Sequence, residues 1–326
     1  MQNNKTTFLD EPASLISQQW NEDAIPLVSI SCITYNHENY IRDAIEGFLI
    51  QKTTFPIEIL IHDDASTDGT KEIIREYETK YPHLIKPLYE VENQWVKGRR
   101  GSVVFNFPRA RGKYIALCEG DDYWTDPLKL QKQVEFLESN EDCSLCFTGS
   151  EIHKSNGEIK SYSYKFTKSI DVNEYIKTPY FIPTASLVFR RDVLNDDLHE
   201  AWMDKAFAGD FILKYKAISI GNIGFIEDKC VVYNKGNVGA WSSRKLTDKV
   251  IQKEHDDNIL ALNYLARKTT VSPILIELKK KHLENAKIFK EALMKKGMRG
   301  LFFLIRNYNY KMNFYIGAYI KNMLIG

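Results

Sequence analysis

The sequence predicts an α/β fold, with a mostly parallel sheet flanked by helices and a helical extension at the C-terminus. Three observations support this fold class. Short segments rich in β-branched residues alternate with amphipathic helical segments as far as residue 139, the pattern changes after about residue 150, and the chain after residue 241 has helical periodicity. Strands that alternate with helices of this length are joined by right-handed crossovers, so neighbouring strands run parallel.

The N-terminal half begins with two strand–helix units. Residues 27–33 alternate apolar and small polar side chains and predict a strand, after which Asn36 can cap a helix. The apolar face of that helix consists of Ile41, Ala44, Ile45, Phe48 and Leu49. Residues 57–61 predict a second strand, residues 63–69 a turn, and residues 71–81 a second helix.

Two more strands and one helix complete this half. Residues 84–89 predict a weak strand, because Pro87 cannot donate to a ladder of hydrogen bonds. Residues 114–118 predict a buried strand. Residues 127–139 predict a helix with Pro127 in its first turn, where a missing N–H costs nothing.

The C-terminal half mixes strand-like and helical segments. Strands are expected at residues 185–189, 223–226 and 230–233, and helices at residues 211–218, 248–267 and 273–295. We therefore expect three regions. They are an N-terminal extension (1–24), an α/β domain (25–242) and a helical extension (243–326) that ends in a basic, aromatic tail.

The composition excludes several classes of protein. The chain has 326 residues, of which 44% are hydrophobic and 27% charged, as in an ordinary globular protein. Its 44 Lys and Arg nearly balance its 43 Asp and Glu, which argues against nucleic-acid binding by bulk charge. We find no apolar leader and no apolar window long enough to cross a membrane, and the five cysteines are odd in number. These features predict a cytoplasmic protein with reduced thiols.

Polar residues follow three of the predicted strands, at residues 34–38, 62–69 and 119–124. Ligands of open α/β sheets bind outside the carboxyl ends of the strands. Acidic clusters at neighbouring strand ends repel each other unless a cation lies between them. Mg²⁺ or Mn²⁺ bound to a phosphate-bearing substrate would remove that repulsion. Helix capping and turn formation are the alternative explanation for residues 63–69.

A basic segment, residues 97–113, lies between two of these loops and contains no acidic residue. Its six cations are Lys97, Arg99, Arg100, Arg109, Arg111 and Lys113. Beside a metal they would clamp a diphosphate; otherwise the segment is a solvated loop. The absence of G-x-G-x-x-G, Walker A, H-E-x-x-H and G-x-S-x-G motifs argues against dinucleotide dehydrogenases, P-loop NTPases, zincins and α/β-hydrolases.

Four motifs in order resemble those of the family 2 glycosyltransferases, which have the Rossmann-like GT-A fold. Residues 28–36 resemble the opening V-S-x-x-x-x-T-Y-N, and residues 62–70 resemble the D-D-x-S-x-D-x-T turn. Residues 112–124 resemble the strand and metal loop G-x-Y-I-x-x-x-D-x-D-D, and residues 208–210 resemble the segment that carries the general base. The resemblance extends over residues 27–242.

The resemblance implies a half that binds a nucleoside diphosphate sugar, most simply a UDP-sugar, in residues 25–125, and an acceptor half in residues 126–242. The implied donor residues are Thr34, Tyr35 and Asn36 at the nucleotide, Asp64 at the base, Asp121 at the ribose and metal, Asp122 at the metal, and Arg99, Arg100 and Lys235 at the phosphates. One of the two adjacent aspartates would be the direct ligand of Mn²⁺ or Mg²⁺.

The implied reaction transfers the sugar to a hydroxyl of a glycan or lipid-linked acceptor in surface polysaccharide synthesis, with inversion at the anomeric carbon. Asp210 would remove the proton of that hydroxyl as general base. From residue spacing alone, Asp210 is also suited to cap the helix that follows it. The two roles are compatible.

Three departures from the family pattern bear on the site. Glu119 stands where the family has the first Asp of D-x-D, residues 233–236 lack the histidine of Y-R-x-H, and A-R-N is not recognisable near residues 104–106. Without that histidine, Lys235 is expected at a phosphate. Glu119 supports an alternative function, a catalytically silent module that binds a sugar nucleotide or a glycan. A nucleotidyltransferase would need a glycine-rich basic loop after the first strand, which residues 34–37 do not provide.

The last region is strongly basic. Residues 279–326 contain eleven Lys and Arg against two Asp and Glu, and residues 301–326 interleave aromatic and basic side chains. This mixture suits the headgroup zone of an anionic membrane, and would hold the protein at the inner face of the cell membrane. Packing on the protein itself or in a homo-oligomer is the alternative.

Overall fold

The computed structural model describes residues 8–21, 24–162, 164, 168–178, 180–236 and 247–307. The chain divides into two compact units. The first comprises Met1–Asp171, Tyr180–His199 and Lys216–Ser243, and the second comprises Val172–Pro179, Glu200–Tyr215 and Arg244–Gly326. Two pieces of the region expected as one α/β domain are therefore grouped with the C-terminal helices.

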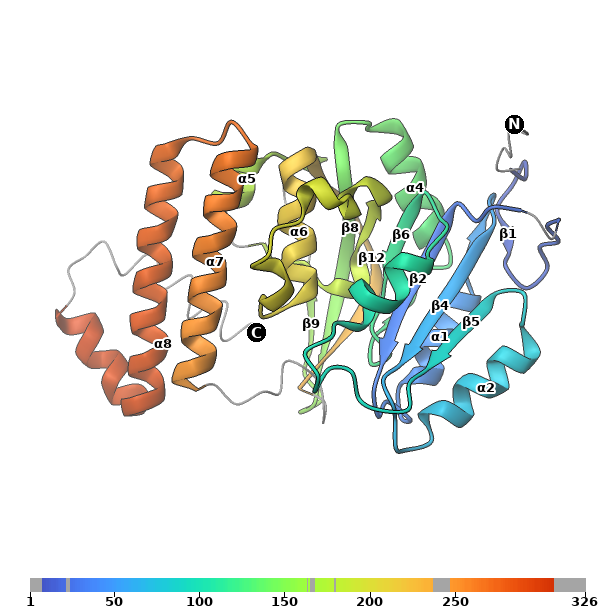
Figure 1. Cartoon of the computed structure of the whole chain (residues 1–326), viewed down its shortest axis with the longest axis horizontal. Helices are drawn as coiled ribbons and strands as arrows, with labels where there is room; N and C mark the ends of the chain where they lie inside the picture. Colours follow the sequence, from blue (N-terminus) through green and yellow to red (C-terminus); the bar gives the residue numbers. More distant parts are fainter. Residues whose placement is uncertain are drawn as a thin grey trace. The chain divides into compact units, whose positions relative to one another are not determined.

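The first unit is built on a mixed sheet (Figure 1). Its main strands are β2 (Val28–Thr34), β4 (Ile57–Asp63), β5 (Ile85–Tyr89), β6 (Tyr114–Leu117), β8 (Cys143–Lys154), β10 (Ser169–Ile170), β11 (Val188–Arg190) and β12 (Asn222–Lys235). Their order across the sheet is β10-β12-β8-β11-β6-β2-β4-β5. Short strands complete the pairing: β7 (Tyr123–Trp124) joins β12, β9 (Ile159–Tyr162) joins β8, and β1 (Ala13–Ser14) pairs separately with β3 (Lys52–Thr53).

The N-terminal strands confirm the predicted α/β class. β6, β2, β4 and β5 run parallel, whereas β11 is antiparallel to both of its neighbours. The parallel arrangement therefore holds for the first half of the sheet, and the second half is mixed. Because the four parallel strands point the same way, the loops after β2, β4 and β6 leave the sheet at one edge.

One face of these strands is covered by α1 (Ile41–Leu49), α2 (Thr70–Lys80) and α4 (Lys129–Ser139). Side chains alternate along a strand, and every second residue of β2 (Val28, Ile30 and Cys32) lies in the core with these helices. α1 contributes the five apolar residues predicted from its periodicity, all of them buried. Full burial of each Ile, Leu or Phe side chain contributes about 1.5–3 kcal/mol.

The opposite face is covered by part of the basic segment. There the π-helix η1 (Ser102–Asn106) packs on β2 and β4 and leads into α3 (Phe107–Arg109). Asn106 is buried, and its amide donates to Ser31 Oγ (3.0 Å) and to the carbonyls of Cys32 (3.0 Å) and Leu60 (3.2 Å). This stretch is thus fixed to the sheet by hydrogen bonds and is not the solvated loop considered above.

Strand boundaries in the second half differ from those predicted. Residues 223–226 and 230–233 belong to one strand, β12, whose register against β8 shifts between Ile226 and Val231. The break in the sequence pattern therefore marks a β-bulge and not the end of a strand. Residues 184–186 form a 3-10 turn, and the strand expected there begins only at Val188. All five cysteines are buried and free, as predicted.

The second unit contains α5 (Val172–Lys177), the first part of α6 (Gly209–Ile220), α7 (Asp248–Lys268) and α8 (Pro273–Asn307). α7 begins after Thr247, whose hydroxyl accepts from the amide of Val250 (3.2 Å). α7 and α8 lie side by side (Figure 1), and Lys290 of α8 pairs with Glu254 of α7 at 2.6 Å. Within the described part of the chain, no helix is both long and apolar enough to span a membrane.

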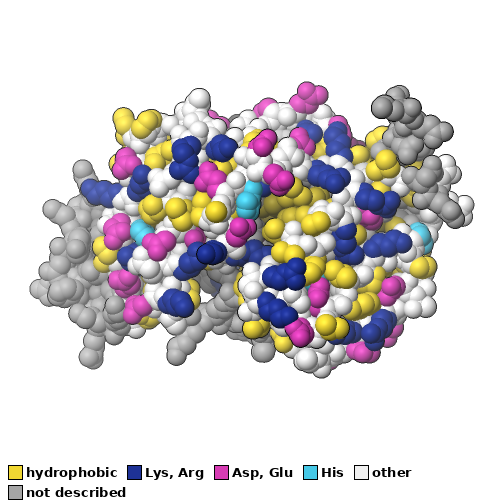
Figure 2. All heavy atoms as spheres, in the orientation of Figure 1, with side chains coloured by type: hydrophobic (Ala, Val, Ile, Leu, Met, Phe, Trp, Pro, Cys, Tyr) yellow, Lys and Arg dark blue, Asp and Glu magenta, His cyan; other side chains and the backbone are white. Residues whose placement is uncertain are grey.

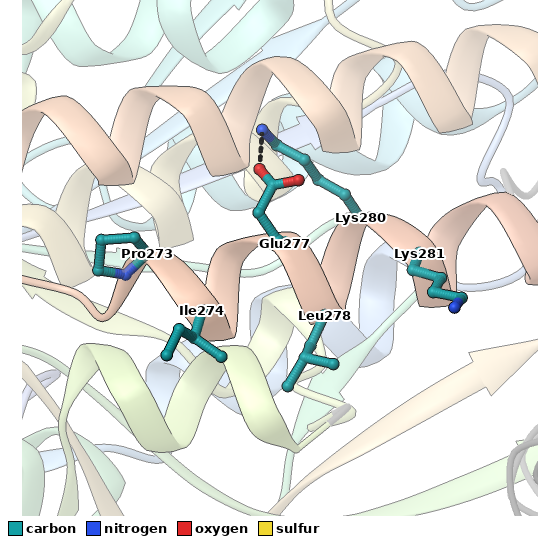
Figure 3. A pocket seen from close by; sticks show the side chains of 6 residues that line it. All are labelled: Pro273, Ile274, Glu277, Leu278, Lys280 and Lys281. Atoms are coloured by element: carbon teal, nitrogen blue, oxygen red, sulfur yellow. Dashed lines mark hydrogen bonds and ion pairs between the residues drawn. The ribbon is translucent and has the colours of Figure 1, made fainter.

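The start of α8 carries an open hollow of about 600 Å³ (Figure 3). Its lining consists of Pro273, Ile274, Glu277, Leu278, Lys280 and Lys281. Ile274 and Leu278 point to the same side of the helix and are 74% and 51% exposed, while Glu277 pairs with Lys280 on another side (2.8 Å). On the face drawn in Figure 2, basic and acidic side chains are interspersed, in agreement with the balanced charge of the sequence.

Candidate active site

Hydrogen bonds lock together the loops that follow β2 and β4. The amide of Asn36 donates to Ser66 Oγ (2.9 Å), and its side-chain oxygen accepts from the amide of Thr67 (2.8 Å). Asn36 has a positive φ of 55°, a conformation that asparagine adopts more readily than most residues. The prediction that Asn36 caps the first helix is wrong, because Asn36 joins two loops and α1 begins at Ile41 without a side-chain cap.

Asp68 and Glu38 join the same two loops again. Asp68 accepts from the amide of Glu38 (3.1 Å) and from the amide (3.1 Å) and hydroxyl (2.6 Å) of Thr70. Glu38 in turn accepts from the amide of Gly69 (2.8 Å). Burial disfavours the charge of Asp68, but the hydrogen bonds from Thr70 and Glu38 outweigh it and lower the pKa of Asp68. The loops after β2 and β4 therefore form one cross-linked platform.

The two aspartates at the end of β4 have different partners. Asp64 is buried, and its carboxylate oxygens accept from the amides of Gln94 (2.6 Å) and Trp95 (3.0 Å). Asp63 accepts from the amide of Ser66 (3.2 Å), and burial raises the pKa of Asp63. Asp64, the residue predicted to contact the nucleotide base, thus also fixes the loop at residues 94–95.

The six cations of the basic segment fall into two groups. Four of them contact residues other than Gln94 and Trp95: Lys97 pairs with Glu92, Arg111 with Glu58 (3.0 Å) and Lys113 with Glu138 (2.7 Å), and Arg109 donates to the carbonyl of Lys86 (2.8 Å). The other two are Arg99, which donates to Gln94 Oε1 (3.1 Å), and Arg100, whose guanidinium lies 5.8 Å from the centre of the Trp95 ring. Arg99 and Arg100 therefore contact the two residues whose amides donate to Asp64.

Gly120 brings the acidic loop after β6 against the end of β2. Its amide donates to the carbonyl of Ile33 (2.9 Å). A Cβ atom at Gly120 would lie 2.7 Å from Thr34 Oγ1 and 3.0 Å from His37 Nδ1, so no larger residue fits without movement. Both of these buried polar atoms lack a hydrogen-bond partner among the described residues. The close approach places Asp121 and Asp122 immediately beyond the platform.

Asn234, near the end of β12, holds the acidic loop from another side. Its backbone amide donates to Asp122 Oδ1 (2.8 Å), and its side-chain amide donates to the carbonyl of Asp121 (2.6 Å). β7 extends the contact, since Trp124 is paired in register with Val231. No pattern in the sequence points to this role, because a lone asparagine in a strand has no distinctive chemistry.

Asp122 is only 2% exposed. Burial, together with the negative charges of Asp121 and Glu119, raises the pKa of Asp122, and the hydrogen bond from Asn234 opposes that shift. No group of three His, Cys, Asp or Glu residues that could hold a metal occurs in the part of the chain that the structure describes. Asp121 and Asp122 are adjacent carboxylates, the type of ligand that hard divalent cations prefer.

The predicted donor residues at the end of β2 differ in exposure. Thr34 is buried, whereas Tyr35 is 42% exposed and Asn36 is partly exposed. Lys235 lies one residue after Asn234, and β-sheet register pairs it with Lys154 of β8. The structure thus brings Thr34 next to the acidic loop, while Lys235 neighbours other lysines.

Asp210 lies in the first turn of α6, within the second unit. Its carboxylate accepts from Lys214 Nζ at 2.7 Å, one helical turn further on. An acidic side chain in the first turn interacts favourably with the helix dipole, so Asp210 stabilises α6 from inside the helix. The spacing suggested that Asp210 caps a helix at residues 211–218 from outside that helix. This alternative is wrong, because α6 begins at Gly209 and Asp210 lies inside it.

Lys129 is a buried charged residue that sequence reasoning did not single out. It is fully buried, its ammonium group lies 4.1 Å from the centre of the Trp124 ring, and it donates to Gln133 Oε1 (2.7 Å). Burial lowers the pKa of Lys129 to about 8. The sequence around Lys129 offers no signal that could have found it, because adjacent helix residues such as Lys129 and the core residue Leu130 do not share a face.

Comparison with known proteins identifies the family. The sequence profile of glycosyl transferase family 2 matches residues 29–196, about half of the chain. The chain belongs to glycosyl transferase family 2. The matched segment of this family 2 chain includes the loops after β2, β4 and β6, so the resemblance predicted from the motifs is confirmed.

Relatives of this family 2 chain include proteins of several bacteria. It is 39% identical over 220 residues to an uncharacterized protein of Mycobacterium tuberculosis. The aligned residues make up 66% of this chain and 61% of the relative. It is 36% identical over 132 residues to the putative teichuronic acid biosynthesis glycosyltransferase TuaG of Bacillus subtilis, with 40% of this chain and 50% of TuaG covered. The chain thus spans about three fifths of the length of the mycobacterial relative and half of TuaG.

Solved structures show the fold of this family 2 chain. S. aureus TarS 1–349 in complex with UDP-GlcNAc superimposes with a TM-score of 0.61 at 18% identity, covering 88% of this chain and 77% of that chain. The mannosyltransferase PcManGT from Pyrobaculum calidifontis, in complex with GDP-Man and Mn²⁺, superimposes with a TM-score of 0.54 at 15% identity, covering 95% and 85%. The predicted GT-A fold is confirmed.

Proposed function

We propose that this chain is a metal-dependent, inverting glycosyltransferase that uses a nucleoside diphosphate sugar, most simply a UDP-sugar, in surface polysaccharide synthesis. The observation that carries the proposal is the loop of Asp121 and Asp122, fixed by Gly120 and Asn234 beside the cross-linked platform. The UDP-GlcNAc complex of TarS and the name of TuaG support the donor class and the pathway class.

The proposed donor site lies at the carboxyl edge of β2, β4 and β6. Its residues are Thr34, Tyr35 and Asn36 at the nucleotide, Asp64 at the base, and Arg99 and Arg100 at the diphosphate. Asp64 suits this role because its carboxylate oxygens retain free lone pairs beyond the two amides that fix them. The guanidinium groups offer paired donors that match phosphate oxygens.

Asp121 and Asp122 are the residues that would hold Mn²⁺ or Mg²⁺. When bound, such a cation neutralises the negative charge of the diphosphate leaving group. The protein contributes by holding two carboxylates in fixed positions before the donor arrives. Asp122 in particular has little freedom to move, because Asn234 holds its Oδ1 atom and the surrounding chain excludes water.

Asp210 is the proposed general base. A hydroxyl of the acceptor glycan or lipid-linked saccharide is a weak nucleophile until a carboxylate removes its proton during attack. Lys214 bonds to one oxygen of Asp210, which leaves the other oxygen to accept the proton. Attack on the face of the anomeric carbon opposite the diphosphate then inverts its configuration.

Calorimetric titration of UDP, with and without Mn²⁺, tests the donor site. We expect Mn²⁺ to tighten UDP binding to the wild-type protein, and the double substitution Asp121→Ala/Asp122→Ala to abolish that effect. Asp228→Asn is the matched control, because it removes one exposed carboxylate that pairs with Lys132 at 2.5 Å. If UDP binds equally with and without the metal, metal dependence is wrong; if GDP or dTDP binds in place of UDP, the nucleotide assignment is wrong.

A catalytically silent sugar-nucleotide or glycan-binding module is the second candidate. The observation that favours it is Glu119 at the first acidic position of the metal loop. The two candidates differ in one measurement, the release of free sugar from UDP-GlcNAc and other UDP-sugars by the wild-type protein. Slow hydrolysis that depends on Asp121 and Asp122 supports the enzyme, and donor binding without any turnover supports the binding module.

We place the proposed enzyme in the cytoplasm, at the inner face of the cell membrane. The basic and aromatic residues 301–326 support this placement, because such mixtures bind anionic lipid headgroups. The last nineteen of these residues lie outside the described part of the chain. Attachment at that surface would bring the site close to a lipid-linked acceptor.

A further inference from the structure

Three flat side chains near the end of β4 form a stack that we call the Arg99 stack: His62 of β4, Phe105 of η1 and Arg99. The Phe105 ring lies against the His62 ring, with 4.5 Å between the ring centres and 12° between the planes. The central carbon of the Arg99 guanidinium lies over Phe105, 4.9 Å from its ring centre. Contacts of this kind between a guanidinium and an aromatic face are attractive.

His62 is the fixed end of the Arg99 stack. It is only 1% exposed, and its Nε2 atom lies 3.5 Å from Glu90 Oε1. Gly101 packs so closely on the ring that a Cβ atom there would lie 2.9 Å from His62 Nδ1. Burial lowers the pKa of His62, so the ring is uncharged at neutral pH and does not repel Arg99. Phe105 therefore rests on a ring that has little freedom to move.

The backbone of Arg99 is held as well. Its amide donates to the carbonyl of Gln94 (3.0 Å), and the amide of Gly98 donates to the carbonyl of Trp95 (2.9 Å). Gly98 has a positive φ of 78°, a conformation that favours glycine in tight turns. The amides of Gln94 and Trp95 in turn donate to Asp64, the residue proposed at the nucleotide base. This turn thus joins Arg99 to the proposed donor site.

The protein does not balance the charge of Arg99. The residue is exposed, and its guanidinium pairs with no carboxylate among the described residues. It donates to Gln94 Oε1 (3.1 Å) and stacks on Phe105, both of which are neutral. Three other cations of the basic segment, by contrast, pair with carboxylates. The remaining N–H donors of Arg99 are thus available to an anion, and their planar arrangement matches the oxygens of a phosphate group.

We propose that Phe105 is a positioning residue that holds the guanidinium of Arg99 in place for the diphosphate of the donor. This inference rests on the glycosyltransferase function proposed above and adds a residue to its donor site. A mobile arginine side chain loses many conformations when it binds an anion, and this loss of entropy weakens binding. Phe105 and Gln94 restrict Arg99 beforehand, so less entropy is lost. Phe105 thus acts on the donor through Arg99.

Calorimetric titration of UDP in the presence of Mn²⁺ tests this role. Arg99→Met should weaken UDP binding about tenfold, because it removes a charged hydrogen-bond donor. Phe105→Leu, which keeps an apolar side chain without a flat face, should weaken UDP binding about threefold. Phe105→Tyr keeps the ring and should retain wild-type affinity. Val103→Ala is the matched control, because Val103 lies in the same π-helix, is 45% exposed and is not part of the Arg99 stack.

A double-mutant cycle shows whether Phe105 acts through Arg99. In the Arg99→Met protein, Phe105→Leu should weaken UDP binding no further, because the side chain that Phe105 positions has been removed. Losses of affinity that simply multiply would contradict the proposal, since Phe105 would then act on the site independently of Arg99. Melting temperatures check that each variant folds, and Phe105→Met takes the place of Phe105→Leu if that change unfolds the protein.

Uridine separates the positioning of Arg99 from a general effect on the donor site, because uridine lacks the diphosphate. We expect Arg99→Met and Phe105→Leu to leave uridine binding, measured by NMR titration, unchanged. If Phe105→Leu weakens uridine and UDP binding by the same factor, the proposal is wrong, because the base-binding part of the site then depends on Phe105.

Pyrophosphate separates this proposal from the proposed function. If the wild-type protein binds no UDP, the proposed function is wrong, and pyrophosphate with Mn²⁺ then tests the Arg99 stack by itself. Pyrophosphate binding that weakens with both Arg99→Met and Phe105→Leu supports the role of Phe105. Absence of pyrophosphate binding, or binding that Phe105→Leu leaves unchanged, overturns it.

Discussion

At the scale of single residues, Gly120 shows how little space the site leaves. Gly120→Ala places a methyl group 2.7 Å from Thr34 Oγ1 and 2.8 Å from Thr34 Cβ. We expect this overpacking to lower the free energy of unfolding by about 1–3 kcal/mol and to weaken UDP binding, since the acidic loop must move. Urea unfolding and calorimetry measure the two effects. Gly69→Ala is the control, because its Cβ would first meet the end of the flexible Glu38 side chain.

A second residue-scale prediction concerns Asp210. Asp210→Asn keeps an oxygen that can accept from Lys214 but cannot take a proton, so we expect kcat of sugar transfer to fall about 10²–10⁴-fold. UDP affinity should not change, because Asp210 is assigned to the acceptor step. Asp256→Asn, an exposed change on α7, is the control. A loss of kcat below tenfold would contradict the assignment of Asp210 as general base.

The sequence predicted which residues lie at the site more readily than it predicted their hydrogen-bond partners. Asp121 and Asp122 stand out because two carboxylates follow a buried strand, but the amide of Asn234 that holds Asp122 comes from a residue more than a hundred positions away. Asn36 was predictable as a polar residue at a strand end and not as a link between loops. Hydrogen bonds between distant segments depend on tertiary structure, which a local pattern does not contain.

At the scale of elements, Asp68 joins the loop after β2 to the start of α2. Asp68→Ala removes the acceptors for Glu38 and Thr70, and we expect it to lower the free energy of unfolding at pH 7 by about 1 kcal/mol. The folded state lowers the pKa of Asp68, so ionised Asp68 stabilises the fold above its unfolded pKa, about 3.9. That stability is lost as the pH falls through the lower, folded pKa.

Urea titrations across pH 3 to 7 measure this dependence. The difference between wild type and Asp68→Ala should be largest near neutral pH and should shrink below about pH 4, where Asp68 becomes protonated in both states. Glu72→Ala removes an exposed carboxylate of the same helix, whose pair with Arg75 is 3.7 Å long, and should change stability little at any pH. If the difference in free energy of unfolding between wild type and Asp68→Ala did not change with pH, the charge of Asp68 would not contribute to stability.

Elements with strong periodicity were predictable, and their boundaries were less so. α1 has the apolar face that the sequence predicts, because helix burial follows from spacing alone. β12 was predicted as two strands, since polar residues 227–229 interrupt the apolar pattern. In the sheet these residues form a bulge next to β8, and hydrogen bonding on both sides keeps the strand continuous.

At the scale of the whole molecule, the sequence predicted the fold class and the family, and contacts between distant segments group the chain into two units. Residues 172–179, within the segment that the family profile matches, and residues 200–215, beyond it, are both grouped with α7 and α8. Long-range contacts decide that grouping, whereas motif order follows the chain. Charge is likewise distributed unevenly: the chain is nearly neutral, and residues 279–326 carry eleven basic against two acidic residues.

The last prediction follows from that uneven charge. Deleting residues 301–326 should release the protein from anionic vesicles while leaving UDP binding unchanged, because the removed segment carries the aromatic and basic residues suited to lipid headgroups. Flotation with phosphatidylglycerol vesicles measures the first effect and calorimetry the second. Vesicles of phosphatidylcholine are the control, and the full chain should bind them more weakly since they lack net charge.

A truncated protein that stays on anionic vesicles would contradict the role of the tail. The exposed Ile274 and Leu278 beside Lys281, at the start of α8, would then be the next surface to change (Figure 3). Ile274→Ser/Leu278→Ser in the truncated chain removes the apolar part and keeps every charge. Release by these two substitutions alone would move the membrane contact from the tail to the start of α8.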